Sequence, residues 1–261
     1  MVKSLSHIPI LSYHKITSQK EFGVNTISPG RFRQQMQYLQ EKKFQSITFQ
    51  DVIHGSIPTK PIIITFDDGY ASVYDEAFPV LKKMNFTAVI FIITGFIGKE
   101  NSWDTSLSSG RFYHLTESQI TALVKGGMEI GSHGVSHRAL NYLSTKELEF
   151  EVNESRQILH QLTHQAILSF AYPFGMQNFS VQQAVRQAGY QYACIHLRGA
   201  SRPVNPFCIP RLPVYRLDGI NSFRWKFGAG PEKRLEMLKL QLFSWPAFLT
   251  PLYQKLFKKL Y

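Results

Sequence analysis

The chain has 261 residues, of which 44% are hydrophobic and 18% are charged, and its formal net charge is +11. This apolar content excludes a disordered chain, and two cysteines exclude a small domain held together by disulfides. At this length the chain can form one large domain or two small ones, and its basic excess is compatible with nucleic acid, an anionic membrane or an acidic substrate.

Short apolar runs alternate with amphipathic helical patterns along most of the sequence. Strands are predicted at 8–13, 62–66, 87–93, 128–132, 167–171, 190–195 and 208–212. Helices are predicted between them, with starts marked by Ser28-Pro29, Thr116-x-x-Gln119, Ser144-x-x-Glu147 and Ser180-x-x-Gln183. Such alternation is typical of parallel strands joined by crossover helices. We therefore predict an α/β fold, a closed (β/α) barrel, with an open doubly wound sheet as the alternative.

Polar residues that can carry chemistry follow several of the predicted strands. In (β/α) barrels the active site lies at the carboxyl ends of the strands. The residues at or near those ends are His14, Asp67, Asp68, His133, His137, Tyr172, Phe174 and Arg211. Their shared position predicts one functional site at one rim of the barrel.

One carboxylate and two imidazoles in this set are suited to hold a metal. His133 and His137 are four residues apart, so on a helical turn both imidazoles face the same way, and Asp68 adds an oxygen ligand. Three ligands leave positions open for water, whose pKa the metal lowers while it polarises a carbonyl. Asp67 can then accept a proton and His14 can protonate a leaving group. The set predicts metal-assisted hydrolysis of an amide or ester.

Each of these patterns also has a structural interpretation. Two adjacent aspartates often cap a helix, and two histidines four residues apart can be capping or core residues. A second pair, His160 and His164, lies late in a predicted helix, where the helix dipole favours exposed histidines.

Two motifs in this order resemble those of the NodB-homology polysaccharide deacetylases, carbohydrate esterase family four. They are Thr65-Phe66-Asp67-Asp68-Gly69 and Ser132-His133-Gly134-Val135-Ser136-His137. Ala171-Tyr172-Pro173-Phe174-Gly175 is similar to the third motif of the family, and Leu11-Ser12-Tyr13-His14 to the N-terminal motif of the poly-N-acetylglucosamine deacetylases. The resemblance covers roughly residues 8–228.

This resemblance implies a deformed (β/α)7-type barrel over residues 1–228, followed by an α-helical extension over residues 229–261. It implies removal of N-acetyl groups from a sugar or glycan, with a divalent metal that we take to be Zn²⁺, and with Co²⁺, Ni²⁺ or Mn²⁺ as alternatives. The metal ligands would be Asp68, His133 and His137.

The resemblance also assigns catalytic roles, with two departures from the family pattern. Asp67 would be the base, His14 the acid, and the backbone N–H of Phe174 would help to bind the oxyanion. Ala171 stands where the third motif usually has an arginine that orients the base, and we hypothesise that Arg211 supplies this charge. No late L-x-H motif is present, so the acid must be His14 or the enzyme has no histidine acid.

Substrate contacts and the type of substrate stay open at the level of sequence. Trp103 could stack on a sugar ring and Asp104 could bond a hydroxyl, but a Trp that closes the barrel mouth is an equal alternative, and the same holds for Tyr172. Alternative functions are an O-acetyl esterase, a hydrolase of another small amide, or a non-enzymatic basic protein that binds nucleic acid or glycan. The site residues favour an enzyme, so we expect no nucleic acid.

The basic charge is concentrated at the C-terminus. Residues 224–261 carry eight lysines and arginines against two acids, a net +6. Within 252–261, apolar residues form a stripe opposite Lys255, Lys258 and Lys259, which predicts either a helix on an anionic membrane or a helix docked on the barrel. Since the N-terminus does not resemble a signal peptide and the cysteines are expected to be reduced, we predict a cytoplasmic protein, with a peripheral site on the inner membrane face and a lipid-linked glycan substrate as a further hypothesis.

Overall fold

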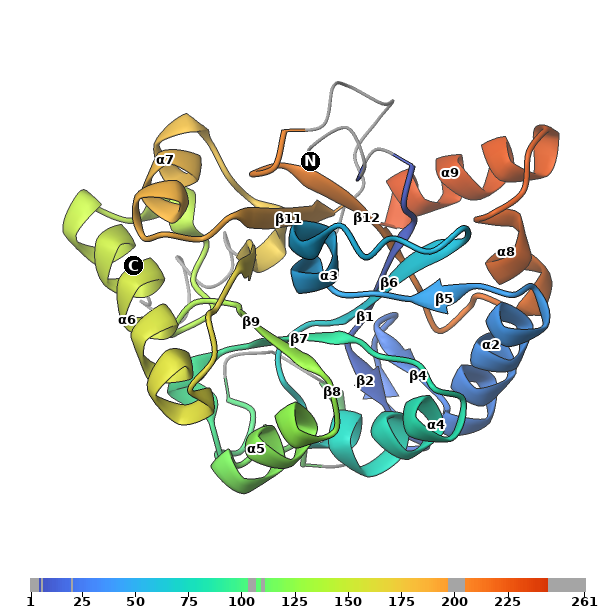
Figure 1. Ribbon diagram of the computed structural model, residues 1–261, viewed down its shortest axis with the longest axis horizontal. Coiled ribbons are helices and arrows are strands. Elements are labelled where there is room, and N and C mark those ends of the chain that lie inside the picture. Colours follow the sequence, from blue (N-terminus) through green and yellow to red (C-terminus); the bar gives the residue numbers. More distant parts are fainter. Residues whose placement is uncertain are drawn as a thin grey trace.

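Seven parallel strands form a closed ring in which the strands follow one another in chain order (Figure 1). The computed structural model describes residues 5, 7–19, 21–102, 107–108, 111–196 and 205–243. The ring consists of β1 (Ile10–Tyr13), β6 (Pro61–Phe66), β7 (Val89–Ile92), β9 (Glu129–Ser132), β10 (Ser169–Ala171), β11 (Tyr192–His196) and β12 (Ile209–Pro213). Because β12 pairs with β1 and β1 with β6, the ring closes. The predicted (β/α)7-type barrel is confirmed and the open sheet is excluded.

Helices surround this ring, five of them between successive strands and α8 after β12 (Figure 1). They are α2 (Pro29–Glu41), α4 (Phe78–Lys83), α5 (Glu117–Lys125), α6 (Thr145–Thr163), α7 (Phe179–Gln187) and α8 (Ile220–Trp225). The predicted capping boxes form at the starts of α5 and α6. Helix α7 begins earlier than predicted, because the side chain of Asn178 caps it by accepting the N–H of Val181.

The barrel is deformed at two places. Strands β9 and β10 share a single pair in register, Phe170 with Ser132, and in the described part of the segment between β11 and β12 no helix forms. Short elements at the carboxyl ends of the strands add to the rim. They are β2 (Lys15–Ile16), β3 (Glu21–Phe22), β4 (Thr26–Ile27), η1 (Val73–Ala77), η2 (Thr94–Phe96), β8 (Leu107–Ser108), η3 (Leu140–Tyr142) and η4 (Pro173–Gly175).

A short helix that we did not predict closes the other end of the barrel. Helix α3 (Phe49–His54) follows β5 (Gln45–Ser46) and lies in front of the ring in Figure 1. Phe49 stacks on Tyr192, at the start of β11, with ring centres 5.2 Å apart. The N–H of Gln50 donates to the carboxylate of Glu129, at the start of β9, over 2.9 Å. The end at which the strands begin is therefore filled, and the opposite rim carries the polar residues.

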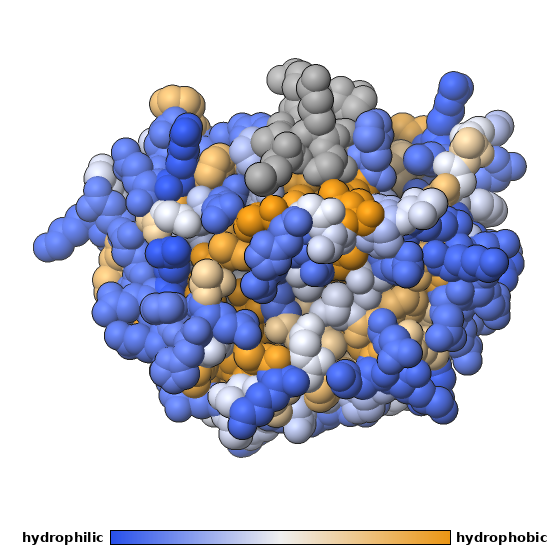
Figure 2. Space-filling model, viewed as in Figure 1, coloured by the Kyte–Doolittle hydropathy of each residue, from blue (hydrophilic) through white to orange (hydrophobic). Residues whose placement is uncertain are grey.

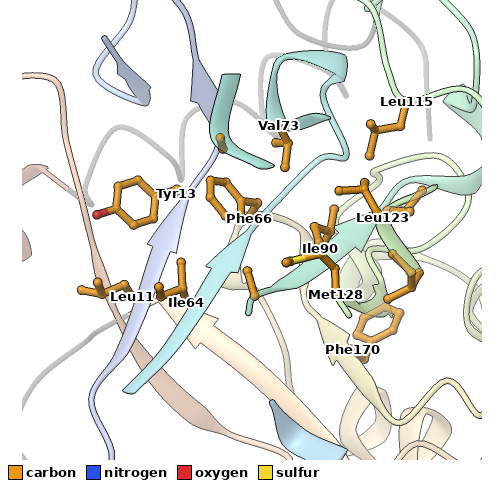
Figure 3. Close-up of a cluster of buried hydrophobic side chains, with 14 of the residues drawn as sticks. Leu11, Tyr13, Ile64, Phe66, Val73, Ile90, Leu115, Leu123, Met128 and Phe170 are labelled. Carbon is orange, nitrogen blue, oxygen red and sulfur yellow. The ribbon is translucent and has the colours of Figure 1, made fainter. Parts of the chain in front are cut away.

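Side chains along the strands alternate between two cores. Leu11, Tyr13, Ile64 and Phe66 point outward and pack with residues of the surrounding helices (Figure 3). Ile10, Ile63, Val89 and Phe91 belong to the cluster inside the ring. Every second side chain of a strand points into the barrel, so Asp67 points inward like Ile63, four residues earlier. Arg211 points inward like Ile209, two residues earlier. The alternation therefore directs Asp67 and Arg211 toward each other across the barrel interior.

Helix α9 (Pro231–Phe243) is joined to the segment before it by buried charges. The ammonium of Lys226 lies 3.0 Å from Asp218 and 2.7 Å from Glu236, and Lys239 contacts the same two carboxylates. On the face seen in Figure 2, the outer helices carry mostly hydrophilic residues, and hydrophobic residues gather toward the middle. Within the described ranges, no helix is long and apolar enough to cross a membrane.

Some of the sequence predictions fall on residues that the structure does not describe. Trp103 and Asp104 lie outside the described residues, and so do residues 244–261, which include the predicted membrane-facing stripe. The domain boundary at residue 228 stays a prediction.

Candidate active site

Asp67, directly after β6, is held by a two-pronged ion pair. Its Oδ1 lies 2.6 Å from Nη1 of Arg211 and its Oδ2 lies 2.7 Å from Nη2. Arg211 also donates to the hydroxyl of Thr65 over 3.0 Å. Both partners are 1% exposed. The structure thus brings together the two residues that we expected to form a base and its orienting charge, and the bidentate geometry fixes the plane of the carboxylate.

The electrostatics of this pair keep Asp67 ionised. Burial by itself raises the pKa of Asp67, but the positive charges of Arg211, His133 and His14 outweigh it and hold this pKa below its ordinary value. The carboxylate is therefore present in the form that accepts protons.

Asp68 points away from Asp67 and faces two imidazoles. Its Oδ1 lies 3.4 Å from Nε2 of His133 and 3.4 Å from Nε2 of His137. These ligand atoms all lie within 4.8 Å of one another, and all three side chains are buried. Asp68 has a φ of 69°, unusual for a residue other than glycine, and this backbone turn separates the directions of the two carboxylates.

The prediction that His133 and His137 share a helical turn is wrong. Residues 133–137 form a loop after β9, and His137 has a left-handed φ of 57°. The imidazoles nevertheless meet, with ring centres 4.9 Å apart, because the loop folds back on itself. The other histidine pair, His160 and His164, is exposed at the end of α6, as interpreted from the sequence.

A buried carboxylate that we did not predict holds this loop. Glu151 of α6 accepts the N–H of Val135 over 2.7 Å and that of Ser136 over 3.1 Å, and it also accepts the hydroxyl of Ser136. Gly134 has a φ of +81°, and a Cβ there would lie 2.9 Å from Oε2 of Glu151. The signal in the sequence was an acid on the apolar stripe of α6, which also carries Leu148 and Val152.

A second residue that we did not predict, His114, contacts the backbone of Asp68. Nδ1 of His114 lies 2.8 Å from the carbonyl oxygen of Asp68. The ring of His114 is buried and stacks on Tyr70, with centres 4.9 Å apart. Burial lowers the pKa of His114, so the neutral ring donates one N–H to this carbonyl. His114 thereby supports the unusual backbone conformation of Asp68.

His14 also approaches Asp67, and a further histidine that we did not predict, His196, lies beside it. Nε2 of His14 is 3.9 Å from Oδ2 of Asp67, and the side chain of His14 is 12% exposed. The ring of His196 is nearly parallel to that of His14, with centres 6.5 Å apart. Burial lowers the pKa of His196 to about 3, and the charge of Arg211 adds to this effect, so the ring is neutral. His196 ends β11, so the rule that selected the other strand-end residues could have found it.

The turn after β10 places Phe174 beside His137. Phe174 has a φ of 58°, and its ring lies 4.6 Å from that of His137. The predicted sugar contact of Tyr172 must be corrected, because Tyr172 is 0% exposed and donates its hydroxyl to the carbonyl of Phe207 over 3.0 Å. Tyr172 is a core residue that supports the turn.

Comparison with known proteins places this site in a family. A model described as polysaccharide deacetylase matches residues 54–193, more than half of the chain. The Bacillus subtilis (strain 168) protein YxkH, named as a polysaccharide deacetylase, is 32% identical over 213 residues, which are 79% of this chain and 71% of that protein.

More distant relatives are similar over comparable lengths. A poly-β-1,6-N-acetyl-D-glucosamine N-deacetylase of Staphylococcus aureus is 23% identical over 231 residues, 78% of this chain and 77% of that protein. The structure of IcaB from Ammonifex degensii superposes with a TM-score of 0.67 at 27% identity and covers 83% of this chain and 94% of that one. The chain belongs to the polysaccharide deacetylase family.

Proposed function

We propose that this protein hydrolyses the acetamido group of an N-acetylated glycan with the help of a divalent metal and releases acetate. The observation that carries the proposal is the pairing of Asp67 with Arg211 directly beside Asp68, His133 and His137. One carboxylate is held ready to accept a proton while its neighbour faces two imidazoles. The relatives named for glycan N-deacetylation support an acetamido substrate.

The donor set suits a divalent metal. Oδ1 of Asp68 is buried and has no hydrogen-bond partner among the described residues. Nδ1 of His133 contacts the carbonyl of Ala171 over 2.6 Å, which directs Nε2 toward Asp68. Burial lowers the pKa of His137 to about 3, so its imidazole is in the neutral form that binds metals. Two nitrogens and one oxygen favour Zn²⁺, and such an ion polarises a carbonyl and lowers the pKa of water.

The chain's own residues move the protons. Asp67, fixed by Arg211, accepts a proton from the water that attacks the acetyl carbon. His14, whose Nε2 lies 3.9 Å from Oδ2 of Asp67, donates a proton to the leaving sugar amine as the C–N bond breaks. The products are acetate and a free amino sugar. The N–H of Phe174, presented by the turn after β10, stabilises the negative oxygen of the tetrahedral state.

Acetate release tests the proposal. The purified protein, supplied with Zn²⁺, is incubated with β-1,6-linked N-acetylglucosamine oligomers and separately with O-acetylated sugars. We expect acetate from the oligomers, loss of activity with a chelator, and recovery on adding metal. Acetate from the O-acetylated sugars alone would make the protein an esterase and overturn the proposal.

Two variants test the assigned roles. Arg211→Met removes the charge that orients Asp67, so we expect a fall in kcat of about 100-fold or more with metal content unchanged. His14→Ala removes the proton donor, and we expect its loss to be smaller for substrates with better leaving groups. If either variant turns over at the unaltered rate, its assigned role is wrong.

A further inference from the structure

His196 lies at the site but takes no part in the proposed proton transfers. It is the last residue of β11, and its side chain points into the barrel like that of Cys194, two residues earlier. It pairs in register with Arg211 of the neighbouring strand. His196 is mostly buried, but part of its surface is exposed. Its ring therefore lies at the open rim, in the same layer as the ion pair of Arg211 with Asp67.

The ring of His196 is next to both the proposed acid and the turn that carries the proposed oxyanion donor. It is nearly parallel to the ring of His14, with centres 6.5 Å apart. A Cβ on Gly175 would lie 2.7 Å from Cδ2 of His196, so this ring packs against the backbone of the residue that follows Phe174. In the proposed mechanism the scissile amide has its nitrogen at His14 and its carbonyl oxygen at Phe174. His196 therefore lies beside the amide bond.

The imidazole of His196 is neutral and has unused hydrogen-bonding capacity. Burial and the charge of Arg211 keep its pKa at about 3. One of its ring nitrogens therefore carries a lone pair and the other an N–H. Among the described residues, the ring contacts that of His14, but no hydrogen bond joins the His196 side chain to another residue. The lone pair is thus available to a ligand at the rim.

The scissile acetamido group carries an N–H that needs an acceptor. This N–H leaves water when the group enters a buried site, and it costs free energy if it stays unpaired. Both oxygens of Asp67 are bonded to Arg211, and Asp68 faces the two imidazoles of the metal-type site. His14 has to present a donor. Of the side chains described at this site, His196 is the one whose acceptor is not already engaged.

We propose that a ring nitrogen of His196 accepts the N–H of the scissile acetamido group and thereby favours N-acetyl over O-acetyl substrates. This inference rests on the proposed function and deepens it, since it assigns the residue that distinguishes an amide from an ester. An ester has no N–H, and its bridging oxygen would bring a second lone pair to the nitrogen of His196. The amide hydrogen stays on the substrate nitrogen while His14 donates a proton to the same nitrogen. The hydrogen bond to His196 therefore persists as the C–N bond breaks and the free amine forms.

The ratio of N-acetyl to O-acetyl hydrolysis tests this role. kcat/KM is measured for a β-1,6-linked N-acetylglucosamine pentamer and for the matched pentamer with O-acetyl esters in place of the acetamido groups. His196→Phe keeps a flat ring and removes the acceptor. We expect kcat/KM for the N-acetyl pentamer to fall about 10–100-fold and that for the ester to change less than about threefold.

Two further variants and a control separate the acceptor from the shape of the ring. His196→Ala, which cannot overpack the rim, should lower the ratio of N-acetyl to O-acetyl hydrolysis in the same direction as His196→Phe. His196→Asn keeps an acceptor oxygen and should recover most of the ratio. His54→Phe is the matched control, because His54 is exposed at the end of α3, at the opposite end of the barrel.

Nitrogen NMR of the metal-free protein gives a readout that does not need turnover. The signal of the unprotonated ring nitrogen of His196 is assigned from its loss in His196→Phe. We expect this signal to move toward the position of a hydrogen-bonded nitrogen at saturating N-acetyl pentamer, and to stay in place with the ester pentamer.

The outcomes separate this role from the proposed function. An unaltered ratio in both His196→Phe and His196→Ala, or an equal loss for both substrates, would overturn the role of His196 even if the unaltered protein releases acetate from the N-acetyl pentamer. Hydrolysis of the ester alone by the unaltered protein would contradict the proposed function, and the role of His196 would fall with it.

Discussion

Two clusters of buried charge in this molecule differ in how completely their members satisfy one another. In the cluster before and within α9, Lys226 and Lys239 each contact both Asp218 and Glu236, at distances of 2.5–3.0 Å. Ser222 adds a hydrogen bond of 2.8 Å to Glu236. The charges are neutralised within the cluster, so it serves to hold α9 in place.

In the cluster at the barrel rim, one of the two aspartates has its hydrogen bonds satisfied and the other does not. Asp67 has both oxygens on Arg211, but Oδ1 of Asp68 has no hydrogen-bond partner among the described residues. Leaving a buried carboxylate oxygen unsatisfied costs free energy. The difference indicates that the α9 cluster is a structural element and that the rim is arranged to receive a ligand.

Replacement of Asp68 should have the largest effect on activity. Asp68→Asn keeps the shape of the side chain but removes the charge that faces His133 and His137. We expect acetate release to fall about 1,000-fold or more and the bound metal to be lost, because a carboxylate ligand is replaced by a weak neutral donor. Elemental analysis after dialysis checks the metal content. Full activity in a variant without metal would contradict the assignment.

Replacement of Lys226 should instead reduce stability. Lys226→Met leaves Asp218 and Glu236 with one ammonium partner in a buried place, which we expect to cost about 3–5 kcal/mol of unfolding free energy. Denaturant titration measures the loss. At a temperature where the variant is folded, its kcat should equal that of the unaltered protein, since the cluster does not touch the site. A fall in kcat with unchanged stability would show that the α9 cluster contributes to activity and not to stability.

The sequence was sufficient to predict the barrel and most of the site because both follow from local patterns. Alternating strands and helices predict the parallel ring, and polar residues at strand ends predict its active rim. The pairing of Arg211 with Asp67 was a hypothesis based on the missing arginine at position 171, and the structure brings the two residues together.

The remaining features depend on contacts between distant parts of the chain. His133 and His137 were expected on a helix, but their loop is shaped by Glu151, which belongs to the following helix. His114 reaches Asp68 across 46 residues. Lys226 and Lys239 were counted with the basic tail, because composition does not show that Asp218 and Glu236 neutralise them.

A further buried acid, Glu129, lies at the closed end of the barrel. Burial raises its pKa to about 7, from an ordinary value of 4.5. Its folded form therefore binds a proton more tightly than its unfolded form, so its contribution to stability is complete below pH 4.5 and is lost as pH rises to 7. Glu129→Gln keeps an acceptor for the N–H of Gln50 and removes the ionisation.

We expect Glu129→Gln to be more stable than the unaltered protein by up to about 3 kcal/mol at pH 8, and the difference to shrink toward pH 5. Denaturant titrations of both proteins at the two pH values measure this difference. A difference that is independent of pH would show that Glu129 does not titrate in this range.

Glu151 shares a feature with each of the two clusters. Like the acids of the α9 cluster it is buried and fully hydrogen-bonded, and like the residues at the rim it helps to place the metal ligands, because it holds the loop that carries them. Glu151→Gln replaces one acceptor oxygen with a donor, which repels the N–H and hydroxyl groups of Val135 and Ser136. We expect metal affinity to fall about tenfold to 100-fold, as for other groups that orient metal ligands, and kcat at saturating metal to change little. Competition with a chelator measures the affinity, and Glu154→Gln on the same helix is the control. If Glu151→Gln lowers stability while metal affinity is unchanged, Glu151 belongs with the structural acids of the α9 cluster, and the ligand loop keeps its shape without it.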